Sequence, residues 1–119
     1  MKDFPEFMKR AENRIDSSQQ NTPDIDGYCY EAADGSQICC WTYYADRDSK
    51  ESIHEFDEYV LCVSGEYVEI FCGEEHLLRP GDELLIPRGT PHHERVKNGT
   101  RTVHAFGGRR IVHEGTHGR

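Results

Sequence analysis

The sequence predicts an all-β domain, a sandwich or barrel of short strands, preceded by one short N-terminal helix. From residue 25 onward, short segments alternate polar and apolar residues with the period of two that strands show. Turn pairs such as Asp34-Gly35, Ser64-Gly65 and Asn98-Gly99 separate these segments. Many short strands with regular turn signals are typical of sandwiches and barrels, and the length of 119 residues suits one domain.

The helix is expected over residues 3–15. Asp3 can cap it and Pro5 suits its first turn. An apolar stripe then recurs about every four residues, formed by Phe7, Met8, Ala11 and Ile15. We therefore expect a helix and polar linker over 1–24, a barrel over 25–113 and a tail over 114–119.

Nine segments have strand character and should build the barrel. Strands are expected at 27–32, 36–44, 52–63, 66–72, 75–78, 83–86, 92–97, 100–106 and 110–113.

Composition excludes several classes of partner. Lys and Arg number 14 and Asp and Glu number 22, so the net charge is −8, which argues against a nucleic-acid partner. Apolar runs stop at four residues, too short to span a membrane, and the start of the chain does not resemble a secretory signal. The five cysteines are odd in number and form no C-x-x-C pair, which predicts reduced thiols and a cytoplasmic location.

Two predicted strands turn histidines and acids toward the core. In 92–97, His92 and Glu94 share the face of Val96, whereas the opposite face, which carries His93, is polar. Glu94 is interpreted either as an orienting or acid/base group beside His92, or as a rim residue in water.

In the expected strand 52–63, His54 and Glu58 share a face with Val60 and Cys62. An unpaired carboxylate among apolar side chains is costly, so we expect Glu58 to be paired, protonated or bound to a metal. Two imidazoles and one carboxylate, from His54, His92 and Glu58, form the set typical of non-haem Fe(II). Divalent Mn, Ni, Zn and Co also accept such ligands.

The same residues resemble two motifs of the cupin family. Ser52 to Gly65 resembles G-x5-H-x-H-x(3,4)-E-x6-G, and Gly81 to His92 resembles the start of G-x5-P-x-G-x2-H-x3-N. The resemblance implies a jelly-roll barrel, a double-stranded β-helix, with a divalent metal held inside one end.

Carried over residue by residue, the resemblance makes His54, Glu58 and His92 the metal ligands. Ser52 replaces the first histidine of the family pattern, and Val96 replaces the closing asparagine of the second motif. Water, the Ser52 hydroxyl or His104 is therefore a candidate for the fourth ligand position. Cys62 and Glu94 are further candidates for the lining of the pocket.

Two functions remain open from sequence. One is a metal-dependent small-molecule enzyme of oxygenase or isomerase type, and the alternative is a non-catalytic ligand-binding or sensing cupin with a degenerate or empty metal site. In the second case His and Glu would bond each other without a metal. Strand residues 59–63 are apolar on both faces, and together with the helix stripe they predict a homodimer.

Overall fold

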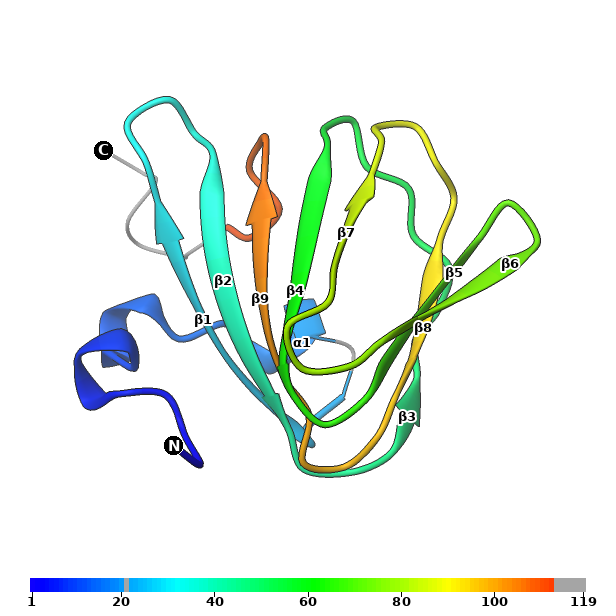
Figure 1. Ribbon diagram of the computed structural model, residues 1–119. Coiled ribbons are helices and arrows are strands. Elements are labelled where there is room, and N and C mark those ends of the chain that lie inside the picture. The colour runs from blue at the N-terminus through cyan, green and yellow to red at the C-terminus, as the bar shows by residue number, and fades with distance from the viewer. Residues whose placement is uncertain (21, 113–119) are drawn as a thin grey trace.

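Two antiparallel β-sheets face each other and enclose the core (Figure 1). The computed structural model describes residues 1–20 and 22–112. One sheet has five strands in the order β1-β2-β9-β4-β7, and the other has four in the order β3-β8-β5-β6. Strands far apart in sequence are neighbours in both sheets, as in a jelly roll.

The strand bounds follow the turn signals of the sequence closely. The first sheet contains β1 (Ile25–Glu31), β2 (Gln37–Tyr43), β9 (Arg101–Phe106), β4 (Glu58–Ser64) and β7 (Glu83–Ile86). The second contains β3 (Arg47–Asp48), β8 (His93–Val96), β5 (Tyr67–Phe71) and β6 (Glu74–Leu78). The expected all-β class is confirmed.

Alternating burial places the core between the sheets. In β4, Glu58, Val60 and Cys62 are buried, while the intervening Tyr59 and Leu61 are only half-buried. This is the alternation predicted from the period of two. Buried apolar side chains from both sheets and from the N-terminal segment form one cluster, which includes Ile15, Trp41, Tyr67, Ile86 and Phe106.

The N-terminal segment differs from the prediction. Residues 3–15 form two 3-10 turns, Glu6–Met8 and Ala11–Asn13, and the one short α-helix of the described chain is α1 (Ser17–Gln20). The expected stripe does not pack as a unit, since Phe7 is 72 % exposed and only Ile15 of its members is buried. A segment this short is marginal as an isolated helix unless its apolar face is covered.

Two of the expected strands differ from the structure. The strand expected at 52–63 begins only at residue 58, and the described part of the strand expected at 110–113 is not formed. Residues 52–57 are not part of a strand, since Asp57 bonds instead to the loop that carries Arg88, accepting its backbone N–H at 2.9 Å. Residues 110–112 form no strand, because the N–H groups of Arg110 and Ile111 bond to the Gln37 side chain at 2.8 and 2.9 Å. Residue 113 lies outside the described residues. The short strand β3 was not predicted.

Gly65 shows why one turn residue is fixed by packing. It has φ +79°, and an added Cβ would lie 2.6 Å from the Thr100 Cα. Thr100 in turn ties the turn to β9, because its hydroxyl accepts the Glu66 N–H at 2.9 Å. The β4–β5 turn therefore needs a residue without a side chain.

Across residues 1–20 and 22–112, no helix has the length and apolar character needed to cross a bilayer. All five cysteines are free thiols, as expected.

Candidate metal centre

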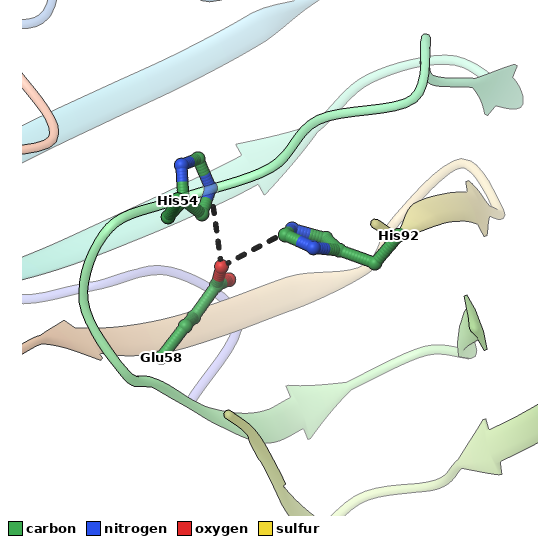
Figure 2. Close-up of side chains that lie close together, drawn as sticks. All are labelled: His54, Glu58 and His92. Atoms are coloured by element: carbon green, nitrogen blue, oxygen red, sulfur yellow. Dashed lines mark ion pairs between the residues drawn. The ribbon is translucent and has the colours of Figure 1, made fainter. Parts of the chain in front are cut away.

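Three side chains from separate segments converge between the sheets (Figure 2). His54 lies in the loop before β4, Glu58 begins β4, and His92 directly precedes β8. Their candidate ligand atoms all lie within 4.8 Å of one another. Nε2 of His54 is 3.5 Å from Glu58 Oε1, and Nε2 of His92 is 3.4 Å from the same oxygen.

Backbone pairing brings His54 and His92 to the same place. Ser52 and His92 form an isolated antiparallel bridge, with N–H···O distances of 2.8 and 2.9 Å. The His54 carbonyl accepts the Gly89 N–H at 2.8 Å, and the His54 ring stacks on Phe56 at a centroid distance of 5.1 Å. The loop 52–57 is thus held against the loop that carries His92.

The two oxygens of Glu58 have different surroundings. Glu58 is 5 % exposed, and its Oε1 is buried without a hydrogen-bond partner in the described protein. Oε2 lies 2.9 Å from His104 Nδ1, and His104 Nε2 lies 2.9 Å from the Thr102 hydroxyl. Since an ionised carboxylate only accepts, His104 Nδ1–H donates to Oε2, and its Nε2 is left to accept from Thr102.

His92 is held in the tautomer that a metal ligand requires. Its Nδ1 lies 2.9 Å from the Thr90 carbonyl oxygen, which can only accept. Nδ1 therefore carries the proton, and in the neutral imidazole Nε2 presents a lone pair. That lone pair faces Glu58 Oε1. Two acceptors directed at each other require a cation between them, either a proton or a metal.

The pKa values of the cluster are set by two opposing effects, burial and the contacts between the side chains. Burial alone would raise the pKa of Glu58, but the contacts with His104 and His92 outweigh it and hold the pKa at about 2. Burial would lower the pKa of His92, but the contacts with Glu58 and the Thr90 carbonyl raise it overall. Burial dominates at His54 and lowers its pKa. Glu58 is therefore an anion at neutral pH, and His54 favours the neutral form that binds metals.

The donor set fits a divalent metal. Two imidazole nitrogens and one carboxylate oxygen converge, and the buried Oε1 lacks the partner that burial demands. The cluster could hold a metal ion.

The remaining predicted residues fall into two groups. Ser52, Glu94 and His104 line the cavity beside the cluster. Cys62 is absent from that lining, and its Sγ lies 3.5 Å from the Ser64 carbonyl oxygen at the far end of β4. His104 serves as the hydrogen-bond partner of Glu58, because both of its ring nitrogens are engaged within the protein.

The interpretation of Glu94 as the group that orients His92 is wrong. The Thr90 carbonyl takes the His92 Nδ1–H, and the half-buried Glu94 is one of the residues that line the cavity. Its position opposite Glu69 in the register of β5 and β8 makes a pair of inward-facing carboxyl groups. Glu69 is fully buried, and neither of its oxygens has a hydrogen-bond partner in the described protein.

Sequence reasoning missed Glu69, two arginines of the cavity lining, and the roles of Thr90 and Thr102. Period-two alternation in β5 places Glu69 on the face of Tyr67, which was a usable signal. No comparable signal in the sequence pointed to Arg47 and Arg110. Arg47 lies on a strand of only two residues, and Arg110 lies in the segment after β9, so neither belongs to a regular alternating pattern.

The fold and the convergent His, Glu and His define a jelly-roll domain with a candidate metal site in its interior. A sequence profile described as the cupin domain matches residues 41–106, and the chain belongs to the cupin family. No protein with a curated description is significantly similar to it in sequence.

Several solved structures share the fold at low identity. An RmlC-like cupin from Shewanella frigidimarina is 14 % identical with a TM-score of 0.69, over 87 % of this chain and 86 % of that one. KdgF from Halomonas sp. is 21 % identical with a TM-score of 0.65, over 71 % and 79 %. Salicylate 1,2-dioxygenase from Pseudoaminobacter salicylatoxidans, in adducts with gentisate, is 12 % identical with a TM-score of 0.65, over 71 % of this chain and 25 % of the enzyme.

Proposed function

We propose that this cupin is a metal-dependent enzyme that acts on a small molecule. A divalent transition metal (Fe, Mn, Ni, Zn or Co) would be held by Nε2 of His54, Oε1 of Glu58 and Nε2 of His92. The observation that carries the proposal is the buried Glu58 Oε1, which lacks a hydrogen-bond partner and faces two imidazole Nε2 atoms at 3.4 and 3.5 Å.

Three protein ligands leave coordination positions open for substrate, water or O2. When bound, such an ion supplies Lewis acidity toward a carbonyl or hydroxyl group, and iron also supplies O2 chemistry of the oxygenase type. An isomerase would use the Lewis acidity together with an acid/base group and would need no O2. The dioxygenase among the structural neighbours supports the enzyme class.

The surrounding residues hold the ligands in their required states. His104 donates to Glu58 Oε2 and fixes the carboxylate so that Oε1 points at the two histidines. The Thr90 carbonyl keeps the proton of His92 on Nδ1. Aromatic rings pack against these residues: Trp41 lies edge-on to His104 at a centroid distance of 4.8 Å, and Phe56 stacks on His54 at 5.1 Å.

Metal analysis of protein purified without chelators tests the proposal. We expect about one equivalent of a transition metal, or its uptake on reconstitution, and loss of the metal in His54→Ala and in His92→Ala. His93→Ala is the matched control, because the neighbouring side chain is outside the ligand cluster. Metal content below about a tenth of an equivalent after reconstitution would refute the proposal.

A non-catalytic sensing cupin is the second candidate. Ser52 stands where the family pattern has a histidine ligand, so the cluster is one ligand short of that pattern. This candidate predicts that a small ligand stabilises the protein without being converted. Product formation by the metal-loaded protein would eliminate it.

We also propose a homodimer formed through the outer face of the five-stranded sheet. Ile38, Ala105, Tyr59 and Leu85 lie side by side across four strands, and Ile38 and Leu85 are 54 % and 57 % exposed. Such an apolar row suits a second copy of the same face. Light scattering at micromolar concentration should give twice the chain mass. Leu85→Lys should give the monomer, whereas Leu77→Lys, a control on the other sheet, should not.

A further inference from the structure

Two arginines line the cavity beside the candidate metal centre. Arg47 belongs to β3, whereas Arg110 lies in the segment that follows β9, so they reach the cavity from different segments of the chain. Within the described part of the chain, neither guanidinium takes part in an ion pair or a side-chain hydrogen bond. The Arg47 guanidinium lies over the Tyr43 ring, 6.0 Å from its centroid, and its charge acts on the Glu94 carboxyl without a direct ion pair.

Unpaired arginines at this place are unexpected in so acidic a chain. The net charge is −8, and other arginines have found acidic partners: Arg14 with Asp26, Arg95 with Glu75, and Arg109 with Glu31. Arg47 and Arg110 are both half-buried. A guanidinium that has lost part of its water without gaining an acceptor is disfavoured, which indicates that a partner outside the protein supplies the acceptor.

The balance of charge in the cavity favours an anion. The lining contributes two arginines and two carboxyl groups, Glu58 and Glu94. With the divalent ion of the proposed function, four positive charges face two negative ones. Arg110 and His54 line the same cavity. A ligand that reaches the metal therefore experiences the field of Arg110.

The size of the cavity limits the group that can enter. Its volume is about 50 Å³. A single water molecule needs at least about 10–15 Å³ by the same measure, so only a few waters or a group of a few atoms can enter. A carboxylate has this size, and its two oxygens match the fork of a guanidinium.

Building on the proposed function, we infer that its substrate class is small carboxylates, recognised by Arg47 and Arg110 at the candidate metal site. In this inference the carboxylate accepts from these arginine side chains in the cavity lining, and the rest of the molecule extends toward the mouth of the cavity. A larger anion such as inorganic phosphate is the alternative ligand, and the test must distinguish it from a carboxylate.

The test uses glycolate and its neutral analogue glycolamide as probes. Binding is measured by ligand-observed NMR and thermal shift, on metal-loaded and on metal-free protein. We expect glycolate to bind at least tenfold more tightly than glycolamide. Arg47→Gln and Arg110→Gln should each weaken glycolate about tenfold and leave glycolamide unchanged, since each removes one charge-assisted contact. Arg79→Gln, a control at an exposed position outside the cavity lining, should match the wild type.

The outcomes separate the inference from the proposed function. Metal content is measured on every preparation, and neither arginine variant should change it. Absence of metal refutes the proposed function. The inference is still tested in that case, because glycolate binding by the wild type and by the two arginine variants is also compared on metal-free protein. Equal binding of glycolate in wild type and in both variants overturns the inference, as does failure of glycolate to bind. If phosphate binds more tightly than glycolate, the inference that the substrates are small carboxylates is overturned. If one variant does not fold, the other decides.

Discussion

Replacing Glu69 by glutamine should remove a loss of stability that the wild-type protein undergoes as the pH rises from 5 to 8. Glu69 is fully buried in β5, opposite Glu94 in β8, and neither carboxyl oxygen has a hydrogen-bond partner in the described protein. Burial, followed by the charges of Glu94 and Glu58, raises the pKa of Glu69 from 4.5 to about 10. The folded protein therefore keeps a proton that the unfolded chain releases.

The sign and size of the effect follow from this difference. Above pH 4.5 the unfolded chain loses the Glu69 proton, so the stability of the wild type falls as the pH rises toward the folded-state pKa of about 10. The slope is about 1.4 kcal/mol per pH unit, which gives about 4 kcal/mol between pH 5 and pH 8. Glutamine does not titrate, so Glu69→Gln lacks this loss. The amide also changes the free energy of unfolding by an amount that does not depend on pH. This amount cancels when the difference between variant and wild type at pH 5 is subtracted from that at pH 8.

Urea unfolding of metal-free protein at several pH values measures the difference. The free energy of unfolding of Glu69→Gln minus that of the wild type should increase by up to about 4 kcal/mol from pH 5 to pH 8. Glu74→Gln, an exposed change on the neighbouring strand β6, should give parallel curves. Parallel curves for Glu69→Gln would show that Glu69 titrates normally and would refute the burial argument.

Three further predictions concern the site and one turn. His104→Phe removes the donor to Glu58 Oε2 and should weaken metal binding by about 10- to 100-fold in a competition titration; unchanged affinity would show that His104 is only packing. The pKa of Glu58, lowered from 4.5 to about 2, stabilises metal-free protein above pH 4.5 by about 3 kcal/mol. This contribution should be lost between pH 4.5 and 2 in urea titrations and be absent in Glu58→Gln. Gly65→Ala should destabilise the protein by about 1–3 kcal/mol more than Gly35→Ala does, since both have positive φ but only Gly65 abuts Thr100; equal effects on thermal unfolding would contradict this.

Sequence reasoning succeeded where strands are regular. The period of two correctly turned Glu58 inward in β4, where buried and half-buried residues alternate from Glu58 to Cys62, and it correctly set Val96 inward in β8. His54 was placed correctly for the wrong reason. It lies in a loop, and the bridge between Ser52 and His92 brings it to the site.

The partners of the ligands were out of reach of sequence reasoning. The Thr90 carbonyl fixes the tautomer of His92 through backbone geometry, which no side-chain pattern encodes. His104 meets Glu58 only because β9 pairs with β4, and this pairing joins residues 46 positions apart. The helix over 3–15 failed because periodicity reports an apolar face without showing what covers it.

The hydrogen bonds around Glu58 bear on the choice between a bound metal ion and a direct pair of His and Glu side chains. A direct pair between His92 and Glu58 requires an imidazolium that donates from Nε2 to Oε1 at hydrogen-bond geometry while Nδ1 donates to Thr90. The Thr90 carbonyl does accept the Nδ1 proton, but the Nε2–Oε1 distance is 3.4 Å, and Oε1 has no hydrogen-bond partner in the described protein. By contrast, His104 Nδ1 donates a hydrogen bond to Oε2 at 2.9 Å. One oxygen of the buried carboxylate therefore has a partner within the described protein, and the other has none. The contrast between the two oxygens of one carboxylate supports the proposal that Oε1 binds a cation together with His54 and His92.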